Sequence, residues 1–306
     1  MTMLDYTHDQ AATSWVQVPA GNDFPIQNLP LGIVKPKDGK ARVVVAIGDQ
    51  VLDLAKLADM GPFDGLAGQA LNLCRHEHLN PLAAAGVAHR RALRLALFGI
   101  LSAEAPRSMV NQVRECLRPA VQNEYLLPFE IGDYTDFYAS LDHAINVGRA
   151  FHTDYTLPSN FTHMPIAYHG RASTVRVSGT SIARPIGQHA PQGGAAPVLA
   201  PSTALDFELE VGVFIGTGNV PDIPIPISAA REAIFGLCLL NDWSARDLQV
   251  WESRPLGPFL SKSFATTVSP WVVTPEALAP FRCEISRPTG FPGPPEYRKS
   301  PGLDST

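Results

Sequence analysis

Three carboxylates stand at alternate positions in the segment LDFELEVGVF, residues 205–214. Asp206, Glu208 and Glu210 share one parity of this run. The other parity is apolar and consists of Phe207, Leu209, Val211 and Val213. Successive side chains of a β-strand point to opposite faces, so the acids would line one side and the apolar groups would form a core face on the other. The acids could face solvent, or they could bind a hard cation, which prefers several oxygen ligands.

A fourth acid follows the apolar run AIFGLCLLND, which reads as a strand. Asp242 ends this run just before a predicted helix, WSARDLQVWE, and could simply be the helix N-cap. Arg246 and Gln249 lie four and seven residues later, on the same predicted helical face, where they could border a pocket as donors to an anion. Lys262 lies in a predicted loop bracketed by Pro and Gly. It is either solvated there or, beside carboxylates, a fixed cation.

A second acid–base pair is predicted on one helix over residues 136–151, DFYASLDHAINVGRAF. Asp136 would lie in its first turn or at its cap. His143 follows seven residues later on the same face, with about 10 Å between the two Cα atoms. A single histidine on a helix is commonly a surface or core residue. This separation would also fit a metal at one end and a proton-transferring imidazole at the other, with a small substrate between them.

Hydrophobic periodicity predicts the elements that must position these groups. Two short strands joined by a turn at Gly48-Asp49 are predicted over residues 42–55. Helices are predicted over residues 65–74, 89–101 and 108–117, and further strands over residues 174–179 and 180–184. Residues 188–202 and the Pro- and Gly-rich residues 282–306 are predicted to be loops.

Composition and charge narrow the class of protein. The 306 residues are 45% hydrophobic and 17% charged, which is typical of a globular protein with room for two domains. The 24 Gly and 28 Pro residues favour a turn-rich and therefore β-rich architecture. A net charge of −5 argues against nucleic acid as a partner, and the absence of a long apolar run argues against a membrane. Without a secretory signal, a cytoplasmic protein with four reduced cysteines is expected.

Several long motifs resemble, in this order, segments of the fumarylacetoacetase (fumarylacetoacetate hydrolase) family. They are GDYTDFYASLDHAINVG, PIAYHGRAS, LDFELEVGVFIG, LLNDWSARDLQVWE and PLGPFLSKSF. DFPIQNLPLG and VAIGDQVLDL resemble the family's N-terminal domain. The resemblance implies an α+β, mainly β protein, usually a homodimer. A small Src-homology-type β-barrel with helices would occupy residues 1–125. A mixed β-sandwich roll, incomplete at its C-terminus, would occupy residues 126–306.

The resemblance also implies roles for individual residues. The family's metal carboxylates fall on Asp136, Glu208, Glu210 and Asp242, with Lys262 and Thr266 beside the ion, which would be Ca²⁺ or Mg²⁺. The catalytic histidine falls on His143, and the groups that stabilise an oxyanion fall on Arg246, Gln249 and Lys262. The implied substrate-binding residues are Tyr138, His152, Tyr168, Gln249 and Ser253. The family has arginine at position 152 and tyrosine at position 253, so substrate recognition is expected to differ at these two positions.

The implied reaction is cleavage of the carbon–carbon bond of 4-fumarylacetoacetate to fumarate and acetoacetate, the last step of tyrosine and phenylalanine breakdown. A metal ion would assist the attack of water, and His143 would be the general base. Two alternatives remain: a related acylpyruvate or diketone hydrolase or decarboxylase, and an inactive truncated remnant. The family's pattern continues beyond residue 306 with a glutamate that orients the histidine, so the chain as given is expected to have low solubility and little activity.

Overall fold

A computed structural model describes residues 4–283 except 38, 152–153, 191–192 and 194–195. The described residues form two compact units. Unit 1 is drawn from Met1–Glu130, Val211–Leu239 and Val268–Cys283, and unit 2 from Ile131–Glu210 and Leu240–Thr267. The chain therefore enters each unit more than once. The two domains predicted from the sequence, 1–125 and 126–306, stay a prediction.

Unit 1 contains a five-stranded antiparallel sheet with the strand order β4-β3-β2-β1-β5. Its strands are β1 (Leu31–Lys35), β2 (Arg42–Ile47), β3 (Gln50–Asp53), β4 (Leu117–Pro119) and β5 (Glu124–Leu126). The predicted hairpin is confirmed, because Ile47 pairs with Gln50 across the turn. Gly48 has φ +52°, a left-handed conformation that glycine adopts without steric cost. The β-unit is thus confirmed, while its closure into a barrel stays a prediction.

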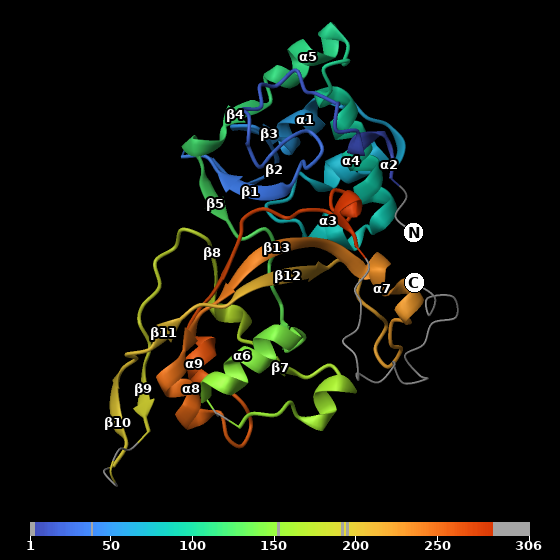
Figure 1. Cartoon of the computed structure of the whole chain (residues 1–306). Coiled ribbons are helices and arrows are strands. Elements are labelled where there is room, and N and C mark those ends of the chain that lie inside the picture. Colours follow the sequence, from blue (N-terminus) through green and yellow to red (C-terminus); the bar gives the residue numbers. More distant parts are fainter. Residues whose placement is uncertain (1–3, 38, 152–153, 191–192, 194–195, 284–306) are drawn as a thin grey trace. The chain divides into compact units, whose positions relative to one another are not determined.

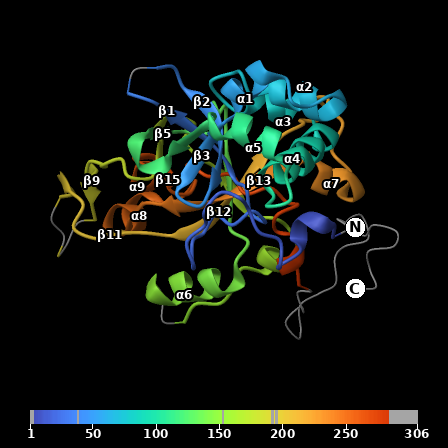
Figure 2. The same cartoon turned by 90° about the horizontal axis from the view of Figure 1, so that it is seen from above.

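The described part of unit 1 also contains six α-helices, of which the first, α1, packs against β2 and β3 of this sheet. They are α1 (Leu54–Met60), α2 (Gly65–Leu73), α3 (Asn80–Ala84), α4 (Val87–Leu101), α5 (Arg107–Arg114) and α7 (Ile227–Ala233). The helices predicted over 65–74 and 89–101 are therefore confirmed. The helix predicted over 108–117 is confirmed in part, because α5 ends at Arg114 and Leu117 begins β4. Figures 1 and 2 both show α2, α3 and α4 gathered together beside the sheet. The five β2 residues from Val43 to Ile47 are fully buried, so both faces of this strand are covered. None of the helices within the described residues is long and apolar enough to cross a membrane.

Unit 2 consists of short strands and helices. Its elements are β6 (Thr135–Phe137), β7 (Ala167–His169), β8 (Val175–Val177), β9 (Ile186–His189), β10 (Val198–Pro201), β11 (Leu205–Asp206), β14 (Ser244–Ala245), α6 (Leu141–Phe151), α8 (Arg246–Glu252) and α9 (Leu260–Ser263). The strand predicted over 174–179 is confirmed by β8, but residues 180–184 form no strand. The loop predicted over 188–202 is partly wrong, because β10 pairs with β9. The loop predicted over 282–306 lies almost entirely outside the described residues.

A four-stranded sheet has the order β12-β13-β15-β8. Here β12 is Leu209–Ile215, β13 is Ile234–Asp242 and β15 is Thr266–Val268. Figure 1 shows β12 and β13 running side by side. The strand predicted over 233–242 is confirmed. The sequence is thus right about the mixture of strands and helices, whereas the β-sandwich roll stays a prediction.

The two faces of β12 are reversed with respect to the expected core. Leu209 and Val211 are 76% and 61% exposed, and Val213 and Ile215 are exposed as well. The opposite parity, Glu210, Gly212 and Phe214, is partly buried. The predicted core face is therefore wrong for the described residues. The inward parity is favoured because Phe214 stacks on Phe129 at 4.4 Å and because the acids find the polar partners described below.

Unit 1 also contains a buried ion pair between α4 and the segment after β15. Arg90 donates to both carboxylate oxygens of Glu276, from Nε at 3.0 Å and from Nη2 at 2.8 Å, and its Nη1 donates to the carbonyl of Ile234 at 2.7 Å. Both side chains are about 5% exposed. Removal of one partner would leave a charge buried without compensation.

Arg90→Met is expected to lower the free energy of unfolding by about 3–5 kcal/mol, because the Glu276 carboxylate stays buried and loses its bidentate partner. Urea unfolding measures this change. The matched control is Arg75→Met, which removes the exposed Arg75–Asp59 pair and should cost less than about 1 kcal/mol. Equal losses for the two variants would contradict this account of the buried pair.

Candidate metal and hydrolytic site

Three acids of unit 2, each on a different strand, form a group that could hold a metal ion. Asp136 comes from β6, Glu210 from β12 and Asp242 from the end of β13, and one carboxylate oxygen of each lies within 4.8 Å of the others. Asp136 is therefore not in a helix, contrary to the prediction. It lies in a strand because β6 pairs with β7, where it stands opposite Tyr168. Glu210 and Asp242 come from the neighbouring strands β12 and β13, whereas Asp136 comes from the separate two-stranded sheet of β6 and β7.

Asp242 is the most buried member of this group. Its Oδ2 accepts hydrogen bonds from the Tyr168 hydroxyl and from Lys262 Nζ, both at 3.0 Å. Its Oδ1 is buried and has no hydrogen-bond partner among the described residues. Asp242 is also not the N-cap of α8, because Ala245 holds that position. An unpartnered carboxylate oxygen beside two further acids fits a divalent cation, which prefers several oxygen ligands.

The electrostatics of the group point the same way. Burial, together with the neighbouring Asp136 and Asp242 carboxylates, raises the pKa of Glu210 to about 8. Burial likewise raises the pKa of Asp242 to about 6, although Lys262 opposes that shift. Near neutral pH, Glu210 therefore keeps a proton unless a cation replaces it. A bound divalent ion would neutralise this repulsion.

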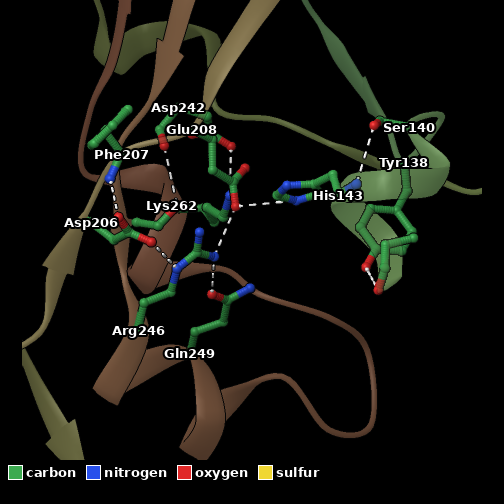
Figure 3. Close-up of polar contacts among 12 residues, drawn as sticks. Tyr138, Ser140, His143, Asp206, Phe207, Glu208, Asp242, Arg246, Gln249 and Lys262 are labelled. Carbon is green, nitrogen blue, oxygen red and sulfur yellow. Dashed lines mark hydrogen bonds and ion pairs between the residues drawn. The ribbon is translucent and has the colours of Figure 1, made fainter. Parts of the chain in front are cut away.

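Glu208 lies beside the three-acid group but has cationic partners (Figure 3). Its Oε2 accepts from Lys262 Nζ at 2.5 Å, and its Oε1 lies 2.8 Å from Arg246 Nη1. Burial by itself would raise the pKa of Glu208. The positive charges of Lys262 and, to a smaller extent, Arg246 lower it by more, so the pKa of Glu208 lies below its ordinary value. Glu208 is thus an ionised acid, and it is only 8% exposed. Its role as a metal ligand stays a prediction.

Lys262 lies in the short helix α9 and not in a loop. It is almost completely buried, and its ammonium donates to both Glu208 and Asp242. Burial lowers its pKa, but the nearby Asp242 and Glu208 carboxylates more than compensate, so the pKa lies above the ordinary value. Of the two interpretations of this lysine, the fixed cation is the one that the structure supports.

Glu252 connects α8 to the start of α9. One of its oxygens, Oε1, accepts from the backbone N–H groups of Phe259 and Ser261 at 2.9 and 2.7 Å, and from the Ser261 hydroxyl at 2.5 Å. Because α8 carries Arg246 and Gln249 and α9 carries Lys262, this contact places the two helices relative to each other. The site therefore depends on a polar contact between the helices.

Arg246 and Gln249 meet within α8, as their spacing predicts. Arg246 Nη1 donates to Gln249 Oε1 at 3.0 Å. The predicted helical face shared with Asp242 is wrong, because Asp242 belongs to β13. Three of the predicted donors, Arg246, Gln249 and Lys262, nevertheless come together around Glu208 (Figure 3).

His143 lies in α6 and faces Glu208. Its Nε2 is 3.6 Å from Glu208 Oε1, and its side chain is one-third exposed. The ring packs edge-on against Tyr138, with 5.7 Å between the ring centroids. The Ser140 hydroxyl accepts from the His143 backbone N–H at 3.2 Å and so caps the start of the helix. Asp136 and His143 thus belong to different elements, and the predicted separation along one helix is wrong.

The remaining predicted site residues are placed as follows. The Tyr138 hydroxyl donates to the Ala144 carbonyl at 3.4 Å, and burial raises the pKa of Tyr138 to about 12. Thr266 Oγ1 lies 3.2 Å from the Tyr134 hydroxyl. The Ser253 hydroxyl donates to the Gln249 carbonyl and so turns back onto α8. His152 lies outside the described residues.

Two residues that were not predicted to contribute to the site, Tyr134 and Asp206, contact predicted site residues. Tyr134 lies against Gly170, where a Cβ atom would fall about 1.9 Å from the tyrosine ring, and it bonds Thr266. Asp206 pairs with Arg246 Nε at 2.9 Å. The alternation of Asp206 with Glu208 in the sequence was a usable signal, although Asp206 ends β11 and Glu208 lies between β11 and β12. No sequence pattern indicated Tyr134.

Two family models match the chain. The fumarylacetoacetase N-terminal model matches residues 27–128, and the fumarylacetoacetate (FAA) hydrolase C-terminal model matches residues 133–287, which include every residue of the candidate site. Fumarylacetoacetase from Oryza sativa subsp. japonica is 48% identical over 288 residues, which cover 92% of this chain and 67% of that protein. Fumarylacetoacetase from Homo sapiens is 44% identical over 290 residues, which cover 93% of this chain and 68% of that protein.

The chain spans about two thirds of the length of these curated relatives. Among solved structures, fumarylacetoacetate hydrolase (EaFAH) from psychrophilic Exiguobacterium antarcticum has a TM-score of 0.44 at 16% identity. The match covers 80% of this chain and 66% of that chain.

In the metal-free protein, the free energy of unfolding is expected to fall as pH rises from 5 to 8. Glu210 keeps its proton in the folded state up to a pKa of about 8, whereas the unfolded carboxyl releases it near its ordinary value of 4.5. The folded state therefore binds more protons in this window, and stability is lost as pH rises through the folded pKa. Urea unfolding at several pH values in EDTA measures the slope. Glu210→Gln should flatten it, and an unchanged slope would contradict the assignment.

Proposed function

Because the chain belongs to the fumarylacetoacetate hydrolase family, we propose that it hydrolyses the carbon–carbon bond of 4-fumarylacetoacetate to fumarate and acetoacetate. This is the last step of tyrosine and phenylalanine breakdown. The observation that carries the proposal is one cluster in unit 2, in which the acid group Asp136, Glu210 and Asp242 lies beside an imidazole and three donor side chains. Such a hydrolysis needs acids that bind a metal cation, a general base, and groups that stabilise a developing negative charge.

The cofactor in this proposal is Ca²⁺ or Mg²⁺, held by Asp136, Glu210 and Asp242. Oxygen-only ligands and the unpartnered Asp242 Oδ1 favour such hard cations over softer metals. When bound, the ion would supply a Lewis acid for a diketone oxygen. Glu208 and Thr266 are proposed as neighbours that complete the surroundings of the ion. Lys262 restrains the Asp242 carboxylate by its hydrogen bond to Oδ2.

His143 is proposed as the general base. Its Nε2 would take a proton from water as the water oxygen forms a bond to the carbonyl carbon on the fumaroyl side. The resulting imidazolium would be stabilised by the ionised Glu208, whose Oε1 lies 3.6 Å away. When the carbon–carbon bond breaks, its electron pair stays on the acetoacetate fragment. That fragment takes the proton back, and fumarate keeps the hydroxyl group.

Three side chains are proposed to stabilise the negative charge that develops on the attacked carbonyl oxygen. Lys262 donates two of its three N–H groups to Glu208 and Asp242. The third N–H group would donate to an oxygen of the substrate. Gln249 uses its carbonyl to accept from Arg246, so its amide N–H₂ group remains a donor. These donors are held by the protein before the reaction, so they need no reorganisation when charge develops.

Substrate contacts are proposed for Tyr138, Tyr168 and the positions of His152 and Ser253. The Ser253 hydroxyl is engaged by the Gln249 carbonyl, so it offers less to a substrate than the tyrosine of the family's pattern. This contact favours a second candidate, hydrolysis or decarboxylation of another acylpyruvate or diketone. Competing turnover measurements on several diketo acids discriminate the two. A cytoplasmic location and a homodimer complete the proposal, and the low solubility and low activity expected from the sequence stay predictions.

His143→Ala is expected to abolish hydrolysis of fumarylacetoacetate above the uncatalysed rate and to leave divalent-ion affinity unchanged. The reason is that His143 provides the base and no part of the three-acid group. Formation of fumarate measures activity, and calorimetry measures ion binding. The matched control is His76→Ala, which changes an exposed histidine of unit 1 and should have no effect. Retained turnover in the His143 variant would remove this residue from the mechanism.

Asp242→Asn is expected to weaken Mg²⁺ or Ca²⁺ binding by roughly tenfold or more, because a buried carboxylate ligand becomes a neutral amide. Wild-type ion affinity should also rise between pH 6 and pH 8 with release of a proton, since Glu210 has a pKa of about 8 in the metal-free protein. Calorimetry in two buffers of different ionisation enthalpy reports both quantities. Equal affinity for the variant and the wild type would place the ion elsewhere.

A further inference from the structure

Asp206 is the first of the three acids in the segment 205–214. Unlike Glu210, it is not a member of the three-acid group, and unlike Glu208, it forms no ion pair with Lys262 within the described residues. Its Oδ2 accepts from Arg246 Nε at 2.9 Å (Figure 3). The Asp206 side chain is about half exposed, whereas the Arg246 side chain is only 16% exposed. The acid therefore reaches inward from the surface to hold a mostly buried guanidinium.

The nitrogens of this guanidinium are used unequally. Nε donates to Asp206, and Nη1 is shared by Glu208 at 2.8 Å and Gln249 at 3.0 Å. Within the part of the chain that the structure describes, Nη2 has no hydrogen-bond partner. A guanidinium is planar and its donors have fixed directions, so contacts at Nε and at Nη1 set where Nη2 points.

Asp206 is itself held in place by backbone contacts. Strand β11 pairs with β14, which places Asp206 opposite Ser244, two residues before Arg246. The Arg246 backbone N–H donates to the Ala204 carbonyl at 2.9 Å, and the Phe207 N–H donates to Asp206 Oδ1 at 2.9 Å. The acid and the arginine therefore come from segments that are already hydrogen-bonded to each other, so the orientation of the carboxylate is constrained.

We propose that Asp206 is a positioning residue, which orients Arg246 so that Nη2 is presented to the oxygen on which negative charge develops. The inference rests on the role of Arg246 in the proposed function. Because the Asp206 side chain is about half exposed, its ion pair with Arg246 should contribute little to stability. Its effect should therefore appear in the reaction and in the behaviour of Arg246, and not in the unfolding transition.

Asp206→Asn tests the inference in the full chain. We expect a roughly tenfold fall in kcat with a smaller change in KM, because the oriented donor acts on the transition state. We also expect Asp206→Glu to restore part of the loss. Asp206→Asn added to Arg246→Lys should cause little further loss, since both changes act on one donor. The matched control Asp222→Asn, at an exposed acid of unit 1, should behave as wild type. Wild-type kcat in Asp206→Asn, or full additivity with Arg246→Lys, would overturn the inference.

A second readout does not depend on turnover. In protein labelled with ¹⁵N-arginine, the Arg246 Nε–H resonance, assigned by its absence in Arg246→Lys, should exchange with solvent faster in Asp206→Asn than in wild type. An unchanged resonance would show that Asp206 does not hold the guanidinium. If wild type fails to hydrolyse fumarylacetoacetate, the proposed function fails, and this resonance alone decides whether Asp206 positions Arg246.

Discussion

The convergence of four carboxylates within unit 2 is the constraint on which the rest of the site depends. The backbones of Glu208 and Asp242 exchange hydrogen bonds at 3.2 and 3.1 Å, so strand pairing forces acids together whatever their charge. Like charges in a partly buried place repel, and each acid is stabilised differently. Glu208 stays ionised between Lys262 and Arg246, whereas Glu210 and Asp242 have raised pKa values. Cations, from the chain or from solution, are what make this arrangement stable.

The two units are organised by different forces. Unit 1 has a continuous apolar core around β2 and its helices, and two of its buried charges, Arg90 and Glu276, form an ion pair. Unit 2 has a thinner set of buried apolar residues: Ala144, Val175, Ala245, Leu248 and Ala265. Its helices are placed largely by polar contacts. Glu252 ties α8 to α9, and Asp247 accepts from Ser202 and Thr203 and so ties α8 to the segment after β10.

Those polar contacts give the site its directionality. Hydrogen bonds constrain angles as well as distances, whereas apolar packing constrains mainly shape. Lys262 and Arg246 donate to acids of the site, whereas Gln249 accepts from Arg246 through its carbonyl oxygen. The outward face of β12, with exposed Leu209 and Val211, lacks such contacts within the described residues. The strand thus combines an organised acidic side with an unpartnered apolar side.

The sequence by itself determined the identity of the chemical groups and some of the local elements. The Gly48 hairpin, the helices α2, α4 and α5 and the strand ending at Asp242 follow from turn chemistry and periodicity, which are local properties. Only the tertiary structure decided that Asp136 belongs to a strand, that Lys262 is buried, and that the acidic face of β12 is the inner one. These outcomes depend on partners distant in sequence, namely Tyr168 opposite Asp136 and Glu208 beside Lys262. Periodicity reports where apolar groups lie along the chain. It contains no information about which charged group will arrive from another segment to make burial of an acid favourable.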